Sequence, residues 1–188
     1  MKVTRSDIEG LLVIDLDARR DERGFFVERF SQERFRANGL PTEFVQDNHS
    51  RSAPRVLRGL HFQHNPPQGK LIGVCRGRIW DVVVDIRPDS PTYGHTASFE
   101  LVERKPQLLW VPAGFAHGFC VLGDEPADVL YKVDVSYNAS GEGGILWNDP
   151  DLAIRWPLAD PQISPRDQNL PRFAEYRANP VTWPITRG

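Results

Sequence analysis

The feature that most constrains the fold is a series of short apolar runs that recur along the chain. Each run has five to eight residues, a length that suits a β-strand better than a helix. Glycine and proline between the runs favour turns. Many short strands joined by turns are typical of β-sandwiches and barrels. The runs are LLVIDL (11–16), LIGVC (71–75), IWDVVVDI (79–86), QLLWVP (107–112), GFCVL (118–122) and VLYKVDV (129–135).

The run at 79–86 also indicates which residues share a face of its strand. Side chains alternate along a strand, so its residues divide into two sets. Trp80, Val82, Val84 and Ile86 are expected on one face, and Asp81, Val83 and Asp85 on the other. The second face therefore carries two carboxylates.

Helical signals are confined to short segments. Residues 31–38 (SQERFRAN) favour a helix, with Ser31 as N-cap and Gly39 just past its end. The tail from Asp149 is rich in proline and polar residues. We expect it to be irregular, with one short helix after Ser164.

Length and composition indicate one domain. Of the 188 residues, 40% are hydrophobic and 26% charged, so residues 1–188 are expected to form a single globular domain. The net charge of −2, with no basic stripe, argues against a nucleic-acid partner. Neither an export signal nor an apolar run of roughly 20 residues is evident, so we expect a cytoplasmic protein that does not enter membranes. Cys75 and Cys120 are then expected to be reduced and buried in strands.

The histidines raise the question of a metal site. Metal-binding jelly rolls of the cupin type usually take ligands from an HxH pair, a following acidic residue, and the histidine of a PxGxxH turn. The turn is present as PAGFAH (112–117), ending at His117. His61 and His64, however, are three residues apart, and a strand would point them to opposite faces. Lys70 lies nearest to the acidic position, where a cation would repel a metal, so we predict no metal.

Each of these side chains also has a structural interpretation. Alone, His61 is better explained as a hydrogen-bonded structural histidine, and Lys70 as a surface residue. His64 stands beside Asn65–Pro67, which favours a solvated loop. Taken together, however, His61 has apolar flanks, Lys70 opens a strand, and His117 ends the cupin-like turn. This combination favours a shared cavity.

In its motifs the chain resembles the dTDP-4-dehydrorhamnose 3,5-epimerases, which are sugar-nucleotide epimerases of the cupin superfamily. The resemblance runs from about Ile8 to Asp167, and its specificity lies in the order and spacing of the motifs. It implies an all-β jelly roll, or β-sandwich barrel, with a few short helices. The motifs are DERGFFVERF (21–30), FVQDNHSRS (44–52), VLRGLHFQ (56–63), QGKL (68–71), WDVVVDIR (80–87), SPTYG (90–94), WVPAGFAHGF (110–119), LYK (130–132), GILWNDP (144–150) and SPRD (164–167).

The reaction implied by this resemblance is an epimerisation without a cofactor. The substrate would be dTDP-4-dehydro-6-deoxy-D-glucose, in which C3 and C5 both lie next to the C4 ketone. Removing a proton from either carbon gives an enolate, and returning one to the opposite face inverts that carbon. The product would be dTDP-4-dehydro-L-rhamnose, in the biosynthesis of dTDP-L-rhamnose for cell-surface polysaccharide.

The resemblance also assigns catalytic roles. His61 would be the base, with Asp167 orienting its ring. Tyr131 would be the acid on the other face of the sugar, although alone it is better explained as a buried strand tyrosine. Lys70 would stabilise the enolate oxygen. Supporting polar groups in the same pocket would be Asp81 and His117.

The remaining positions carried over from the family concern the nucleotide. Arg58 and Arg166 would hold the phosphates, because the guanidinium fork matches phosphate oxygens. Other ligand contacts would be Gln46, Asp47, Asn48 and Glu142. In the family, three contacts come from the neighbouring subunit, so a homodimer with shared sites is implied. Those three are Arg23, Phe26 and Glu28.

One departure from the family leaves a narrower activity open. Family members often carry two adjacent aromatic residues after the LYK strand, whereas here Ser136 precedes Tyr137. The loop HNPPQG (64–69) is also rich in proline. The first alternative is therefore an epimerase that inverts only C3 or C5 in another deoxysugar pathway. The second is a cupin that binds a sugar or metal without catalysis, which the presence of His61, Tyr131 and Asp167 argues against.

Overall fold

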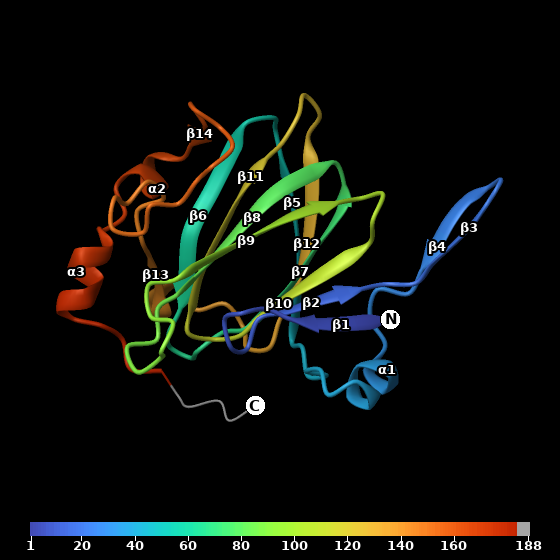
Figure 1. The fold of residues 1–188 in the computed structure, drawn as a ribbon, viewed down its shortest axis with the longest axis horizontal. Helices are drawn as coiled ribbons and strands as arrows, with labels where there is room; N and C mark the ends of the chain where they lie inside the picture. The colour runs from blue at the N-terminus through green and yellow to red at the C-terminus, as the bar shows by residue number, and fades with distance from the viewer. Residues whose placement is uncertain (184–188) are drawn as a thin grey trace.

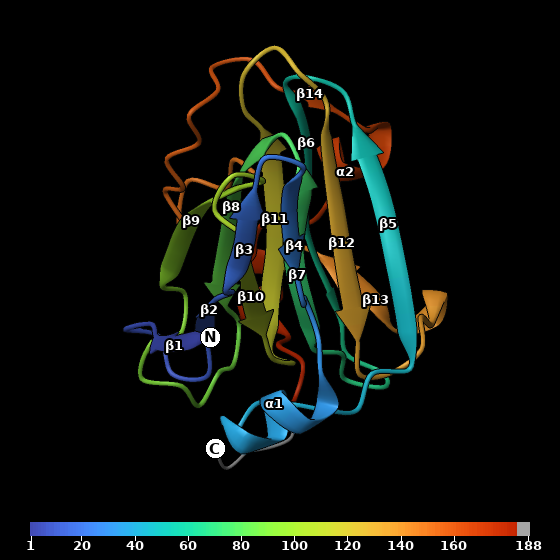
Figure 2. The same ribbon diagram turned by 90° about the vertical axis from the view of Figure 1, so that its right-hand side faces the viewer.

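The computed structural model describes residues 1–183 and consists of two packed β-sheets with a few short helices (Figure 1). This confirms the predicted all-β class. In spatial order, the first sheet contains β1 (Lys2–Arg5), β2 (Leu12–Asp15), β10 (Gln107–Val111), β7 (Lys70–Arg76), β12 (Ala127–Val133) and β5 (Gln46–Ser52). The second contains β13 (Glu142–Gly144), β6 (Val56–Gln63), β11 (Phe115–Val121), β8 (Arg78–Asp85) and β9 (Thr96–Val102), with β14 (Gln162–Ile163) parallel to β6. Figure 2 shows β5 at one edge of the first sheet, beside β12.

The predicted strands are all present. Each of the six apolar runs overlaps a strand of the structure, namely β2, β7, β8, β10, β11 and β12. The alternation along β8 is also confirmed. Val82 and Val84 pack into one hydrophobic cluster, and Val83 packs into another. Asp81 and Asp85 are both fully buried.

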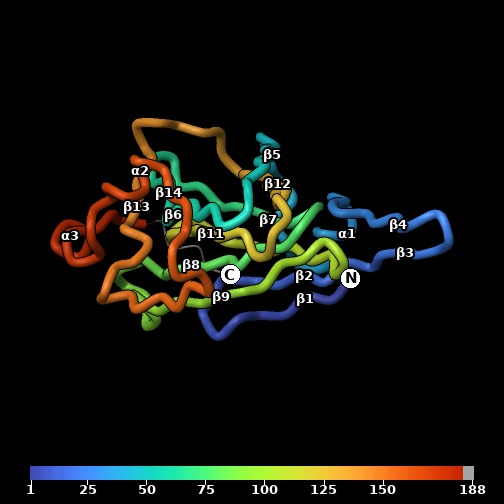
Figure 3. The backbone as a smooth tube through the Cα atoms, turned by 90° about the horizontal axis from the view of Figure 1, so that it is seen from above, coloured from blue at the N-terminus to red at the C-terminus, as the bar shows by residue number. Residues whose placement is uncertain are grey.

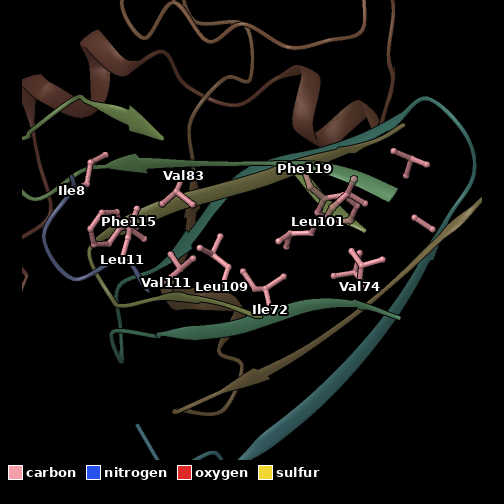
Figure 4. Close-up of a cluster of buried hydrophobic side chains, with 14 residues drawn as sticks. Ile8, Leu11, Ile72, Val74, Val83, Leu101, Leu109, Val111, Phe115 and Phe119 are labelled. Carbon is pink, nitrogen blue, oxygen red and sulfur yellow. The ribbon is translucent and has the colours of Figure 1, made fainter. Parts of the chain in front are cut away.

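The main core lies between the two sheets (Figure 4). Ile72 and Val74 of β7 and Leu109 of β10 contribute from the first sheet, and Val83 and Phe119 from the second. Each of these side chains is less than a tenth exposed. Burying one such side chain stabilises a fold by about 1.5–3 kcal/mol. The interior therefore holds the sheets at a fixed separation.

The C-terminal segment covers the outer face of the second sheet. It contains α2 (Pro165–Gln168) and α3 (Phe173–Ala178), and Phe173 and Tyr176 pack there against Leu60 and Phe62 of β6. Helix α2 follows Ser164 as predicted, and the Ser164 side chain caps it. The tail is more ordered than predicted, because α3 and β14 were not expected. Apolar residues of the tail find partners on a sheet face that no local pattern reveals.

Helix α1 (Gln32–Ala37) lies against the outer face of the first sheet. Ser31 accepts a hydrogen bond from the Arg34 backbone N–H, and Gly39 has a φ of +67°, so both predicted ends are confirmed. Phe35 is 2% exposed and packs into a cluster with Leu71 of β7. The packing of Phe35 thereby holds residues 32–37 against the first sheet.

The hairpin of β3 (Ala18–Asp21) and β4 (Gly24–Val27) projects away from the two sheets, as Figures 1 and 3 show. We call residues 18–27 the arm. Phe25 and Phe26 lie on it with exposed fractions of 54% and 69%. Two exposed phenylalanines on a projecting two-stranded hairpin leave apolar surface of the arm accessible.

The prediction for the cysteines is half right. Cys120 is buried, but Cys75 is exposed, and both are free thiols. Ile72 and Val74 point into the core, so Cys75, the next residue along the strand, lies on the outward face of β7.

Across residues 1–183, no helix is long and apolar enough to cross a membrane. Before the short strand β13, a 3₁₀ turn, η1, occupies Ala139–Gly141.

Candidate active site

Strand β6 brings two polar residues to one face through a break in its pairing. Arg58 and His61 are three residues apart, so a regular strand would point them to opposite sides. Across from them, the register of β11 shifts between His117 and Phe119. Gly59 has a φ of +119°, and a Cβ there would lie 2.6 Å from the Cα of a residue in β11. Only glycine fits this close approach.

His61 faces the interior. Its neighbours Leu60 and Phe62 pack on the outer face with the C-terminal segment, so the ring between them points inward. His61 Nε2 lies 2.8 Å from Asp167 Oδ1. The other oxygen, Oδ2, accepts the backbone N–H of Gly59 at 3.1 Å. Asp167 thus joins α2 to the break in β6.

Asp167 is held as a buried carboxylate. Its backbone N–H donates to Ser164 Oγ at 3.1 Å, and its side chain is only 6% exposed. Burial alone would raise the pKa of Asp167. Hydrogen bonds from His61 and from the Gly59 backbone outweigh burial and keep the pKa below its usual range. The carboxylate can therefore orient the His61 ring and stabilise its protonated form.

A second histidine–carboxylate pair lies beside the first. His117 of β11 is the direct register partner of His61, and its Nε2 lies 2.8 Å from Asp81 Oδ2. Asp81, on β8, is fully buried. Burial raises its pKa, against the opposing effects of His117 and Lys70. The sequence placed both residues near the pocket but did not reveal their direct contact.

Lys70 is the first residue of β7 and shares the inward face with Ile72 and Val74. Burial lowers the pKa of Lys70 to about 8, although Glu142 and Asp81 act to raise it. Within residues 1–183 its ammonium is influenced by the charges of Glu142 and Asp81 but has no hydrogen-bond partner. A cation with unused donors in the interior can bind a developing oxyanion.

Tyr131 approaches from β12 of the first sheet. It packs against the core between the sheets. Burial raises the pKa of Tyr131, the charge of Arg58 lowers it by less, and the charge of Glu142 adds to the rise. The hydroxyl therefore remains protonated at neutral pH and can donate a proton. Arg58 is fixed nearby, since its Nε donates to Ser52 Oγ at 2.8 Å.

Glu142 lies at the centre of a third cluster of hydrogen-bonded side chains. Its Oε2 accepts from Arg166 Nη2 at 2.8 Å and from the Tyr137 hydroxyl at 2.9 Å. Burial would raise the pKa of Glu142, but these two hydrogen bonds lower it. Tyr137 is 56% exposed and leaves a flat aromatic surface accessible. The sequence singled out Tyr137 only as the aromatic residue that follows Ser136.

Strand β5 brings some of its predicted contacts to the interior but not all. Gln46 Nε2 donates to Asn48 Oδ1 at 2.8 Å, and both are partly buried on the same face as Ser52. Asp47 points to the opposite face and pairs with Lys132 at 3.1 Å. Ser52, which holds Arg58, was not predicted, although the alternation from Gln46 would have found it.

The three predicted contacts on or beside the arm also lie outside the interior site of their own chain. Arg23 pairs with Asp21 on the arm at 2.6 Å, and Glu28 pairs with Arg34 at 3.0 Å. Phe26 is exposed, as described above.

Within residues 1–183, no three His, Cys, Asp or Glu side chains gather closely enough to hold an ion. His64 lies past the end of β6, bridged to Pro67 and only partly buried, away from His61. A cavity of about 420 Å³ lies between residues 27–30 and residues 130–132 of β12, so its lining includes Tyr131 but neither histidine pair.

Known proteins match the chain over nearly its whole length. The family model of dTDP-4-dehydrorhamnose 3,5-epimerase matches residues 5–175. The dTDP-4-dehydrorhamnose 3,5-epimerase of Shigella flexneri is 46% identical over 177 residues, which is 93% of this chain and 97% of the relative. A dTDP-4-dehydrorhamnose 3-epimerase of Streptomyces niveus is 39% identical over 179 residues, covering 94% of this chain and 86% of the relative.

A solved structure extends this similarity to the fold. The dTDP-6-deoxy-D-glucose-3,5-epimerase from Legionella pneumophila, in complex with dTDP-4-keto-L-rhamnose, has a TM-score of 0.91 and 40% identity to this chain. The alignment covers 97% of this chain and 98% of the Legionella chain. Such coverage leaves no large segment of either protein without a counterpart. The chain therefore belongs to the dTDP-4-dehydrorhamnose 3,5-epimerase family.

Proposed function

We propose that the protein is an isomerase that converts dTDP-4-dehydro-6-deoxy-D-glucose into dTDP-4-dehydro-L-rhamnose by inverting C3 and C5. The observation that carries this proposal is the His61–Asp167 pair, 2.8 Å apart, in the interior of a chain of this family. The reaction would serve dTDP-L-rhamnose biosynthesis. Because each inversion proceeds through an enolate, it needs an acid, a base and an electrophilic cation but no cofactor.

His61 is the proposed base. Its Nε2 is engaged by Asp167, which leaves Nδ1 to accept a proton from C3 or C5. Asp167 then stabilises the imidazolium, as the buried carboxylate does in a catalytic triad. We expect His61→Ala to abolish turnover while binding of the nucleotide product persists. An active His61→Ala enzyme would reassign the base.

Lys70 and Tyr131 complete the proposed chemistry. The ammonium of Lys70 would lie at the C4 oxygen, where one preorganised donor typically lowers the barrier by ~3–4 kcal/mol. Tyr131 would return the proton from the side opposite to His61. Support comes from their positions, because both belong to the first sheet whereas His61 belongs to the second.

The nucleotide would lie along the remaining polar groups. Arg58 and Arg166 are the cations proposed for the phosphates, and Arg58 is already oriented by Ser52. The other proposed contacts inside one chain are Gln46, Asn48, Asp81, His117 and Glu142. Asp47 stays a proposed contact only through its backbone, because its side chain faces away.

We further propose a homodimer in which the arm of each chain supplies Arg23, Phe26 and Glu28 to its partner's site. Support comes from the projection of the arm and the 69% exposure of Phe26. We also propose one domain over residues 1–188, of which 184–188 lie outside the described residues, and a cytoplasmic location with neither nucleic acid nor membrane as partner.

Complementation tests the shared site. Two inactive variants, His61→Ala and a double Arg23→Ala, Phe26→Ala variant, are mixed in equal amounts and allowed to exchange subunits. In the mixture one site in four has both an intact interior and an intact partner arm, so about a quarter of wild-type activity should return. A control mixture of His61→Ala with Tyr131→Phe should regain no activity, because both residues belong to the interior part of the site and every subunit then carries a defect there. No recovery despite hybrid dimers, detected by native mass spectrometry, would refute the shared arm.

The activity itself is tested by proton NMR of the reaction in deuterium oxide, without added cofactor. Deuterium entering at both C3 and C5, with an L-rhamno product trapped by a reductase, is the expected result. Exchange at one carbon only would favour the alternative, a single-carbon epimerase. That alternative is motivated by Ser136 and by the Streptomyces niveus 3-epimerase. No exchange at either carbon would refute both.

A further inference from the structure

The segment between β12 and β13, residues 134–141, is fastened to the loop that follows β6, residues 64–69. Hydrogen bonds join the two at successive positions, with their chain directions reversed. They are Gly69 N–H to Asp134 Oδ1 at 2.7 Å, Gln68 Nε2 to the Val135 carbonyl at 2.9 Å, Asn138 Nδ2 to the Asn65 carbonyl at 2.7 Å and His64 N–H to the Gly141 carbonyl at 2.8 Å. We call residues 63–69 and 134–141 the clamp. Both departures from the family, the prolines of the loop and Ser136, lie within it.

Gln63 lies at the centre of the clamp. It is the last residue of β6 and is only 3% exposed. Its Nε2 donates to the carbonyl oxygens of Ser136 at 3.2 Å and Pro66 at 3.0 Å. Its Oε1 accepts the backbone N–H of Asn138 at 2.8 Å. A buried amide that is satisfied in this way has one preferred position, so Gln63 holds the backbone on both sides of Tyr137.

Tyr137 connects the clamp to the site. Its backbone N–H donates to Gln46 Oε1 at 3.0 Å, which fixes it toward β5 as well. Its hydroxyl donates to Glu142 Oε2 at 2.9 Å, and the same oxygen accepts from Arg166 at 2.8 Å. Glu142 of β13 is also the direct register partner of Gln63, so the two side chains share one face of the sheet. The position of Tyr137 therefore bears on how Arg166 is presented.

We propose that Gln63 is a positioning residue for the phosphate end of the site, because by fixing Tyr137 it keeps Glu142 and Arg166 oriented. The inference rests on the proposed function, in which Arg166 binds the phosphates of the nucleotide. Without the Gln63 amide, the backbone around Tyr137 would sample other positions. Binding would then have to order Glu142 and Arg166, which lowers affinity. Proton transfer by His61 would be affected much less.

Fluorine NMR without substrate shows whether Gln63 fixes Tyr137. The chain has four tyrosines, so protein labelled with 3-fluorotyrosine gives few signals, and Tyr137→Phe identifies the one that matters. Gln63→Met retains an unbranched side chain of similar length but lacks the amide. In this variant the Tyr137 signal should narrow and move toward that of free fluorotyrosine. An unchanged Tyr137 signal in folded Gln63→Met would overturn the proposal.

Calorimetric titration with dTDP measures the effect on the phosphate end. Gln63→Met should weaken dTDP binding by about tenfold, since Glu142 and Arg166 must then be ordered on binding. KM for the sugar nucleotide should rise by a similar factor, whereas kcat should fall by about threefold or less. A merely structural role would lower kcat through a loss of active protein and leave the affinity for dTDP unchanged. That result would refute the proposal.

Gln68→Met is the matched control. Gln68 also donates from its amide to a carbonyl of the segment 134–141, but it does so at Val135, on the β12 side of Tyr137. Its replacement should leave the Tyr137 signal in place and the affinity for dTDP within about twofold of wild type. If Gln68→Met weakens dTDP binding as much as Gln63→Met, the clamp as a whole is responsible, and the assignment to Gln63 fails.

A double variant shows whether Gln63 acts through Tyr137. Gln63→Met should add almost nothing to the loss of affinity in Tyr137→Ala, whereas the effects of independent residues add. Additive losses would overturn the proposal. If Gln63→Met does not fold, Asn138→Ala takes its place, because Asn138 is only partly buried and ties the same backbone to Asn65. It should also weaken dTDP binding, and an unchanged affinity would refute the role of the clamp.

Failure of the proposed function gives a different result. If the wild type binds no dTDP and exchanges no deuterium, the proposed function is wrong, and no phosphate end exists to be positioned. If the wild type binds dTDP and only the Gln63→Met affinity is unchanged, the proposed function stands and the positioning role of Gln63 is refuted.

Discussion

Gly59→Ala should destabilise the protein and disable the His61 site together. A Cβ at this position would lie 2.6 Å from Gly118 Cα and 2.8 Å from the His117 carbonyl oxygen. Both are backbone atoms, which cannot swing away as a flexible side chain can. Strand β6 would have to move from β11 at the point where His61 and Asp167 are joined.

The size of the effect follows from two contributions. Alanine at the Gly59 φ of +119° costs about 1–3 kcal/mol of backbone strain. Inserting a methyl group into a packed interior costs about 1–3 kcal/mol more. The free energy of unfolding should therefore fall by about 2–6 kcal/mol. A strand shift approaching 1 Å would also lower kcat by about 100-fold.

Gly123→Ala isolates the clash from the strain. Gly123 also has a positive φ, +80°, but its added Cβ would meet only the tip of the Arg78 side chain at 3.8 Å. Gly123→Ala should therefore lower the free energy of unfolding by about 1–2 kcal/mol. Urea unfolding gives the free energy of unfolding of both variants. The two are compared at the same protein concentration, because association contributes to apparent stability. If Gly59→Ala is no less stable than Gly123→Ala, the close approach of β6 and β11 is not what requires glycine.

Three shorter predictions follow from other parts of the molecule. Tyr131→Phe should still exchange deuterium at C3 or C5 but fail to invert; normal inversion would assign the acid elsewhere. Phe35→Ala should lower the free energy of unfolding by about 3–5 kcal/mol, since Phe35 is 2% exposed, and a loss below 1 kcal/mol would contradict its packing role. A hydrogen bond from Arg51 lowers the pKa of Asp128 to about 2. The ionised Asp128 therefore stabilises the fold above about pH 3.9, the pKa of an aspartate in the unfolded chain, and this contribution is lost as the pH falls toward 2. The gap in unfolding free energy between wild type and Asp128→Asn should shrink over that range, and a gap that persists at pH 2 would refute it.

Local pattern was sufficient for the six apolar strands, but not for more polar strands such as β5 and β9, nor for which strands pair with one another. The lengths and alternation of the apolar runs predicted β8 and its two faces because these depend on adjacent residues. The pairing of β2 with β10, or of β5 with β12, joins residues far apart in the chain and left no local signal. Cys75 was placed wrongly for a related reason. Its run is apolar, but which face of β7 is covered depends on distant segments.

The site shows the same division between local and distant information. Lys70 at the start of a strand and His117 at the end of a turn were visible locally. Asp167 could be linked to His61 only through the family resemblance, because 106 residues separate them. The regular period of a strand would have separated Arg58 from His61. Both lie on the inward face of β6, where Arg58 stays exposed, because Gly59 breaks that period. The alternation of neighbouring residues does not predict where such a break occurs.

The two-sheet architecture suits the proposed chemistry for a geometric reason. Packed sheets lie about 10 Å apart, which leaves room for a sugar ring between side chains that point inward from each. Tyr131 and Lys70 point inward from the first sheet, and His61 from the second. A base and an acid on the same sheet would return a proton to the face from which it was removed, and no carbon would be inverted. Placing them on opposite sheets makes inversion the direct consequence of a single deprotonation and reprotonation.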